Sequence, residues 1–234
     1  MSHFRSLLIL FSIGVFIACQ PNTSKKPERS IESVTLLGDT LFTPKSSSQA
    51  ALNQYANAKA DYEENPYAAE TVIWYSRRMA YLGRFQEAIQ MYTKGIEEHP
   101  KDARMYRHRG HRYISTRQYD KAIADFEKAV SLIEGQPDQV EPDGLPNSRN
   151  IPLSTLHGNI WYHLGLAYYL NDDMDNALKA YSNRTVTERY PDNLVSGGYW
   201  LYMINRRLGH VEEANKALEK VEPDIDIIEN MSYQ

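Results

Sequence analysis

From residue 49 onward, apolar and polar positions alternate with the spacing of helices that bury one face. Apolar residues stand three or four positions apart, and short breaks rich in glycine or charged residues separate the runs. Residues 49–64 form the first run, with Tyr55, Ala58 and Tyr62 on one side. The pattern predicts a helix at residues 49–64, followed by a series of helical pairs.

The pattern of the helical pairs repeats with a fixed period. Ala88 and Ala122 occupy the same place in two copies and lie 34 positions apart. Ala177 takes that place in a third copy, after an insertion, and Ala214 takes it in a weaker fourth copy. We expect repeats at residues 69–102, 103–134, 158–191 and 195–223, with an insertion at residues 135–157.

These copies resemble the tetratricopeptide repeat, a helix–turn–helix unit of 34 residues. The third copy carries the signature most fully, in Trp161, Leu164, Gly165, Tyr168 and Ala177. One helical pair cannot bury its apolar face alone, so the copies must stack. The resemblance implies an all-α fold: a right-handed α-solenoid of about four repeats over residues 49–234. A helix at 49–64 is expected to cap one end, and the tail from residue 224 the other.

The chain begins with a short positive segment and an apolar run that ends at Ala18 and Cys19, its only cysteine. About 20 apolar residues span a bilayer, and this run is shorter, as in a signal peptide. Residues 16–19 resemble the lipobox of bacterial lipoproteins, which are cut before a cysteine whose thiol carries diacylglycerol. The resemblance implies a signal peptide at residues 1–18, lipidation at Cys19 and, because Gln20 follows, an outer-membrane protein of the bacterial envelope facing the periplasm. An ordinary secretory signal is the alternative.

Residues 19–48 have the composition of a tether. They contain three prolines, the Lys25–Lys26 pair and a run of serines. Within this stretch, residues 34–42 are too apolar for a free linker. We predict a short strand or a segment docked on the repeats there, and a strand that docks a partner is the functional alternative.

Composition and motifs narrow the classes of function. The 234 residues carry a net charge of −4 and a mean hydropathy of −0.57, which indicates neither a nucleic-acid binder nor a multi-span membrane protein. A single cysteine excludes an internal disulfide and a cysteine-rich metal site. No Gly-rich phosphate loop, HExxH motif or nucleophile elbow is present. We therefore expect a non-enzymatic protein with no cofactor and no metal. The enzymatic alternative is an acid–base set of His111, His163 and a carboxylate of the insertion.

The resemblance implies a concave groove lined by the first helix of each repeat. The lining positions are basic and aromatic, although the chain as a whole is acidic. An acidic or C-terminal peptide fits such a surface, because guanidinium groups pair with carboxylates and tyrosine offers flat amphipathic area. Solvated helix faces that pair with neighbouring acids are the alternative. The candidate partner-binding residues are Arg77, Tyr81, Arg104, Arg107, His111, Tyr162, Tyr169, Tyr199, Arg206 and Arg207.

The second copy concentrates four arginines and two histidines between residues 104 and 112. Such a run needs acids nearby or an anionic ligand, and we expect a buried ion pair for Arg109.

The insertion contains four prolines, which indicates an ordered and stiff segment. It either folds over the groove or forms an exposed spacer. Its polar side chains that would reach the groove are Glu141, Asp143, Asn147 and Arg149.

The sequence thus predicts a protein–protein interaction scaffold, anchored to the envelope, that binds a peptide or protein partner of acidic character. The alternative is a protein that binds a small anion or glycan fragment and closes the insertion over the Arg/His cluster.

A solvated ion pair contributes only about 0–1 kcal/mol. If Arg77 and Arg107 serve binding alone, replacing both by Gln should leave stability nearly unchanged.

Overall fold

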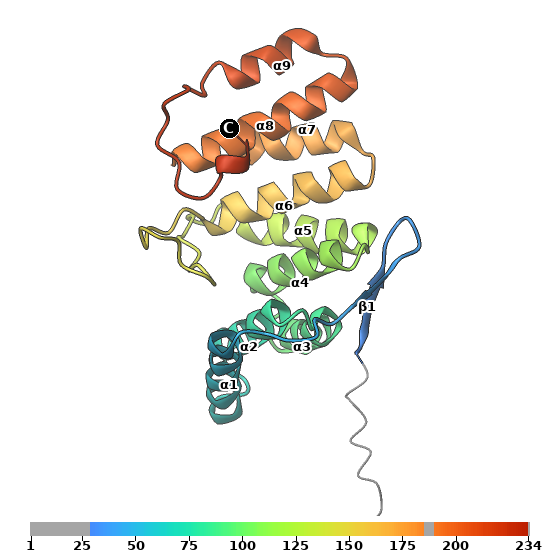
Figure 1. The fold of residues 1–234 in the computed structure, drawn as a ribbon, viewed down its shortest axis with the longest axis vertical. Helices are drawn as coiled ribbons and strands as arrows, with labels where there is room; N and C mark the ends of the chain where they lie inside the picture. Colours follow the sequence, from blue (N-terminus) through green and yellow to red (C-terminus); the bar gives the residue numbers. More distant parts are fainter. Residues whose placement is uncertain (1–28, 185–189, 234) are drawn as a thin grey trace, which may run out of the picture.

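The computed structural model describes residues 29–184 and 190–233, so the expected signal peptide and Cys19 lie outside the described residues. The helices stack in pairs into a solenoid that runs from α1 at one end to α9 at the other (Figure 1). This is the all-α repeat fold predicted from the sequence. No helix of the described stretches has the length and apolarity needed to cross a bilayer. The helices are α1 (Gln49–Glu64), α2 (Ala69–Tyr81), α3 (Phe85–Glu98), α4 (Ala103–Ser115), α5 (Tyr119–Ile133), α6 (Leu156–Leu170), α7 (Met174–Arg184), α8 (Pro191–Leu208) and α9 (Val211–Leu218).

Each of the first three helical pairs closes around an alanine and a large ring on its second helix. In the second and third pairs, a glycine on the first helix lets the two backbones approach, whereas the first pair has the buried Ser76 at that position. A Cβ atom on Gly110 would lie 2.9 Å from the ring of Phe126, and one on Gly165 would lie 2.6 Å from the ring of Tyr181. In these two pairs, a side chain in place of glycine would collide with the buried ring, so the close packing of the two helices depends on glycine. The alanines and rings at these positions are at most 1% exposed: Ala88, Tyr92, Ala122, Phe126, Ala177 and Tyr181.

The two ends of the stack are closed differently. Helix α1 packs on α2 through Tyr55 and Tyr62, whose ring centroids lie 5.5 and 5.1 Å from that of Tyr75. The tail does not form the second capping helix that we expected. Apart from one 3₁₀ turn, η2 (Met231–Tyr233), its described part is irregular and returns along α8. The carboxylate of Asp192, at the start of α8, holds it by accepting backbone N–H groups of residues 228–230.

Residues 29–48 were expected to belong to a tether, but the structure gives much of this segment fixed contacts. Strands β1 (Ile31–Val34) and β2 (Thr40–Phe42) form an antiparallel hairpin, which stands beside the stack in Figure 1. Glu32 accepts the backbone N–H of Gln86 at the start of α3 at 2.8 Å. Ser33 donates to the carbonyl oxygen of Thr116 at the end of α4 at 2.6 Å. The apolar stretch at residues 34–42 thus contributes to both strands, but the docking contacts come from Glu32 and Ser33, which precede it and satisfy groups at helix ends. Leu36 and Leu37 of the stretch remain exposed.

The insertion between α5 and α6 is also ordered by backbone bonds. Its two arms run antiparallel, with a bridge between Val140 and Thr155. The N–H of Glu141 donates to the carbonyl of Ser154, and the N–H of Leu156 donates to that of Gln139. Figure 1 shows the insertion projecting beside α4 and α6, with its tip near α4. This arrangement brings a remote segment to the surface formed by the first helices of the repeats.

Candidate functional site

The first helices of the four pairs, α2, α4, α6 and α8, form a surface that we call the first-helix face. Helix α2 contacts α4, and α4 contacts α6, so residues from successive repeats become neighbours. The sequence-predicted residues on this face separate into two groups. One is cationic and lies on α2 and α4, and the other is aromatic and lies on α6 and α8.

The arginine cluster consists of Arg77 on α2 with Arg107 and Arg112 on α4. The three side chains line one cavity of about 110 Å³, together with Tyr81, His111 and neighbouring residues. Arg77 and Arg107 are only 8% and 7% exposed. Of the ten predicted partner-binding residues, the structure brings four together here: Arg77, Tyr81, Arg107 and His111.

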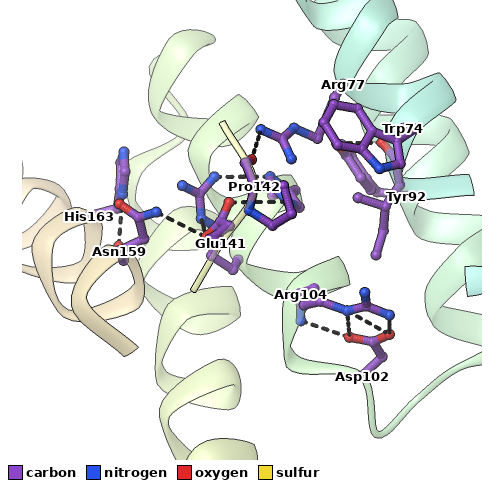
Figure 2. A network of polar contacts seen from close by, with 12 residues as sticks. Trp74, Arg77, Tyr92, Asp102, Arg104, Glu141, Pro142, Asn159 and His163 are labelled. Carbon is purple, nitrogen blue, oxygen red and sulfur yellow. Dashed lines mark hydrogen bonds and ion pairs between the residues drawn. The ribbon is translucent and has the colours of Figure 1, made fainter. Parts of the chain in front are cut away.

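Two carbonyl oxygens of the insertion lie on the edge of this cluster. Arg77 stacks over Trp74, with its guanidinium carbon 4.3 Å from the ring centroid, and donates to the carbonyl of Pro142 at 2.9 Å (Figure 2). Arg78 donates to the carbonyl of Gly144 at 2.8 Å. A Cβ atom on Gly144 would lie 1.6 Å from the hydroxyl oxygen of Tyr81, so only glycine allows this approach. The insertion therefore covers the outer side of the cluster, as one of our two alternatives expected.

The insertion also supplies the one carboxylate that pairs with the cluster among the described residues. Glu141 is 7% exposed, and its Oε2 lies 3.1 Å from Nε of Arg107. That N–H is not aligned for a hydrogen bond. Asn159 on α6 donates to the same carboxylate at 2.9 Å, a contact visible in Figure 2. Glu141 thus links the insertion to α4 and α6 through a buried charge.

The histidines beside the arginines are held neutral. Burial lowers the pKa of His108 and of His111 well below the ordinary value, and the adjacent arginines lower both pKa values further. Burial likewise lowers the pKa of His163 on α6 to about 3, with Arg107 as the next cause. Arg107 donates to Nδ1 of His108 at 2.9 Å, an arrangement that only an unprotonated nitrogen can accept. The positive charge of this region therefore resides on its arginines.

The second group is an aromatic cluster around Trp200 on α8. Tyr169 and Tyr199 place their ring centroids 5.1 and 5.4 Å from that of Trp200, both edge-on. The indole N–H of Trp200 lies 3.2 Å from the hydroxyl oxygen of Tyr162 and donates to it. Tyr233 of the tail adds its hydroxyl 3.1 Å from that of Tyr162 and its ring beside Tyr199. Three predicted residues, Tyr162, Tyr169 and Tyr199, are thus brought together and partly covered by the tail.

The three remaining predicted arginines belong to neither cluster. Arg104 pairs with Asp102 and with Glu70, away from the cavity, as Figure 2 shows for Asp102. Arg206 is exposed and lies over the ring of Tyr202. Arg207 is exposed at the end of α8, where it pairs with Asp172 and lies over Tyr169. Arg104 and Arg207 therefore follow the alternative to a binding groove, in which arginines on a solvated helix face pair with neighbouring acids.

The burial of Arg77 and Arg107 changes what their replacement should do. We expected the double Gln variant to keep its stability if these residues served binding alone. Within the fold, Arg77 instead donates to a carbonyl of the insertion and Arg107 forms an ion pair with Glu141, so their loss removes structural contacts and should lower stability. The expected ion pair of Arg109 is confirmed, since its guanidinium lies 2.7 Å from Asp125.

Sequence reasoning did not select Arg112 or Trp200 as site residues. Arg112 lies one helical turn after His108 and shares its side of α4, so the helical spacing contained the signal. Trp200 follows Tyr199 directly and turns inward to pack between rings, which spacing alone does not reveal.

Within residues 29–184 and 190–233, no three or more His, Cys, Asp or Glu side chains are grouped so that they could hold a metal ion.

Comparison with known proteins gives the repeats a family. Two sequence profiles of the tetratricopeptide repeat match residues 78–139 and 158–183. The human tetratricopeptide repeat protein 13 is 43% identical over 99 residues, which are 42% of this chain and 10% of that protein. This chain therefore matches only a tenth of the length of that curated relative.

Solved structures agree on the fold. MamA from Desulfovibrio magneticus RS-1, from residue 41 to its end, superposes with a TM-score of 0.56 at 17% identity, over 74% of this chain and 84% of that one. YrrB, described as a TPR protein with an unusual peptide-binding site, gives a TM-score of 0.53 at 21% identity, over 71% and 75%. The chain is thus an all-α solenoid that contains tetratricopeptide repeats.

Proposed function

We propose that this chain is a non-enzymatic interaction scaffold that holds a peptide or protein partner against its first-helix face. The repeat fold supports this proposal, and so does its likeness to YrrB, a TPR protein described by its peptide-binding site. The observation that carries it is the insertion itself. Glu141, Pro142 and Gly144 place a carboxylate and two carbonyl oxygens on the arginine side of the face.

The insertion indicates which partner chemistry this face accepts. The guanidinium groups of Arg77 and Arg78 donate to main-chain carbonyls, and Arg107 lies against a carboxylate. An extended segment that carries an acidic side chain offers the same acceptors. Hydrogen bonds to charged groups contribute on the order of 1.5–3 kcal/mol each. Next to this region, the aromatic cluster offers rings with low conformational entropy, which suits the apolar part of a partner.

A pull-down from detergent-solubilised envelopes tests the partner. The bait is the full chain, compared with the double variant Arg77→Gln, Arg107→Gln and with Arg104→Gln, whose arginine lies outside the cluster. Circular dichroism at the assay temperature identifies folded baits. We expect one stoichiometric protein with the unsubstituted chain and with Arg104→Gln, and at least tenfold less of it with the double variant. Equal capture by a folded double variant would assign the partner to another surface.

We also propose that Cys19 anchors the scaffold to the bacterial envelope, in the outer membrane facing the periplasm. The support is the apolar run that ends at Ala18 and Cys19. One acyl chain binds a membrane weakly, whereas two or three anchor stably. The variant Cys19→Ser should therefore move from the membrane fraction to the soluble fraction, as measured by fractionation with a high-salt wash. If Cys19→Ser is processed normally and still sediments with membranes, the anchor proposal is wrong.

A further inference from the structure

The cavity of the arginine cluster has a lining made of hydrogen-bond donors. Helices α2, α3 and α4 contribute three arginines, two histidines, two tyrosines and one alanine, and no carboxylate belongs to the lining. Its volume of about 110 Å³ compares with roughly 30 Å³ for one water in the liquid. Three guanidinium groups that share one partly open cavity repel one another unless an anion lies between them. The lining therefore calls for a group that is negatively charged and rich in acceptors.

Arg112 is the residue that the fold leaves without a counter-charge. Within the described part of the chain, it forms no ion pair, and its guanidinium donates no hydrogen bond to another residue. Its guanidinium lies over the ring of Phe85, with the guanidinium carbon 5.5 Å from the ring centroid. Burial lowers the pKa of Arg112 to about 10, and the repulsion from Arg107 and Arg77 acts in the same direction. A cation in this position is disfavoured by the fold alone, and an anion in the cavity would relieve the repulsion.

Glu141 does not remove this excess of charge. Its carboxylate pairs with Arg107 and lies 3.5 Å from Nε2 of the neutral His108 on the side of the insertion, and it does not line the cavity. One carboxylate thus stands against three guanidinium groups. The imidazoles of His108 and His111 stay neutral. Each therefore has one nitrogen that donates a hydrogen bond and one that accepts, and neither adds a positive charge.

We propose that the cavity between α2, α3 and α4 binds a small tetrahedral oxyanion of the phosphate or sulfate class, held by Arg77, Arg107 and Arg112. Guanidinium forks match the paired oxygens of such anions. Arg112 can direct its whole guanidinium fork at the anion, and Arg77 and Arg107 can add the N–H groups that their bonds to Pro142 and to Nδ1 of His108 leave free. Donors from three side chains exceed what the two oxygens of a carboxylate can accept, whereas four oxygens around one centre can serve all three. This inference goes beyond the interaction scaffold, since it requires no partner protein.

The test uses the full chain, purified in a mild detergent and dialysed into a chloride buffer. Its melting temperature is measured with inorganic phosphate, sulfate or acetate, each against sodium chloride of equal ionic strength. A ligand that binds only the folded chain raises the melting temperature, and at about 100 times its Kd we expect a rise on the order of 5 °C for phosphate or sulfate. The planar acetate should give a smaller rise.

Three arginine variants locate the response. Arg112→Gln should abolish the response to phosphate, yet melt in chloride at the same or a higher temperature. Among the described residues the substitution removes no ion pair or hydrogen bond, and the relief of repulsion from Arg77 and Arg107 offsets the lost contact with the ring of Phe85. Arg112→Lys keeps the charge without the planar fork, so its response should be weaker than that of the unsubstituted chain. Arg206→Gln removes an exposed arginine outside the cavity and should respond in full.

The proposal has clear failing results. It is overturned if the unsubstituted chain does not respond to phosphate or sulfate, or if Arg112→Gln responds equally. A response to acetate as large as that to phosphate would overturn the tetrahedral class. Because no partner protein is present, each of these results leaves the scaffold proposal standing, and failure of the pull-down leaves the anion site standing.

Discussion

The two halves of the first-helix face are built from different chemistry, although a remote segment covers part of each. The arginine cluster on α2 and α4 holds buried positive charge and takes its carboxylate, Glu141, from the insertion. The aromatic cluster on α6 and α8 consists of uncharged side chains whose rings and hydroxyls contact one another, with Tyr233 of the tail as an additional member. Arg184 and Arg207 lie over the rings of Tyr162 and Tyr169 at its edges. The charged half depends on an acid from elsewhere, whereas most contacts of the aromatic half come from its own helices.

The largest effect should come from removing the carboxylate of the charged half. Glu141→Gln leaves Arg107 buried without its counter-charge, and breaking a buried ion pair costs about 3–5 kcal/mol. Urea denaturation should show a loss in the free energy of unfolding of this order. Asp143→Asn is the matched control on the same segment. Burial raises the pKa of Asp143, so its charge is disfavoured in the fold, and neutralising it should leave stability equal or slightly higher. Equal midpoints for the two variants would show that the charged half does not depend on Glu141.

A smaller effect should follow on the aromatic half when the tail is loosened. Asp192 is 1% exposed, and its carboxylate accepts the backbone N–H groups of Ile228, Glu229 and Asn230. Asp192→Asn removes the charge and part of the accepting capacity, at a cost of about 2 kcal/mol. Hydrogen exchange at residues 228–230 should accelerate, while exchange in α6 and α8 stays slow because the rings remain packed. The exposed Asp172→Asn serves as the control. Rapid exchange throughout α8 would mean that the aromatic half depends on its covering segment as much as the charged half does.

The smallest effect is expected at the contact that joins the two covering segments. Arg149 of the insertion pairs with Asp226 of the tail, at side-chain exposures of 46% and 70%. Water and salt screen such a pair, and its formation costs side-chain entropy. The urea midpoint of Arg149→Gln should therefore equal that of the unsubstituted chain. A clear fall in the midpoint would show that the insertion and the tail act as one unit over both halves.

Local periodicity was sufficient to predict the helical repeats. Ala122 and Phe126 are one helical turn apart, and the same pair recurs 34 residues earlier as Ala88 and Tyr92, so a local pattern encodes the burial of both. The return of the tail could not be predicted in this way. Asp192 and Ile228 are 36 residues apart and belong to no repeat, and the bond between them follows from the chain's path in space.

The sequence predicted which residues belong to the candidate site better than it predicted what each of them contacts. Arg77 and His111 occupy the same position of two successive repeats, Arg107 lies one helical turn before His111, and the structure places all three beside one cavity. Their acceptors, Glu141 and Pro142, lie in a segment without periodicity, so the sequence left open whether the insertion reaches the face. Helical spacing puts Arg112 on the side of His108 and Arg109 on another side of α4, but it does not tell what lies opposite Arg112. Arg109 has Asp125 on α5 as a partner, whereas Arg112 meets no acid among the described residues, a difference that depends on what the neighbouring helices place opposite each side of α4.

The hairpin and the insertion also bear on the kinetics of folding. A plain solenoid is held by contacts between neighbouring repeats, so folding can nucleate anywhere and spread, and the end repeats unfold first. Here Ser33 bonds to Thr116 across 83 residues, and Arg77 bonds to Pro142 across 65. Such contacts close large loops late in folding and raise the contact order of the chain. The first two repeats should consequently unfold as a single cooperative block, more slowly than an isolated repeat pair, and the chain should reach its native state more slowly than an uninterrupted helical array of the same length.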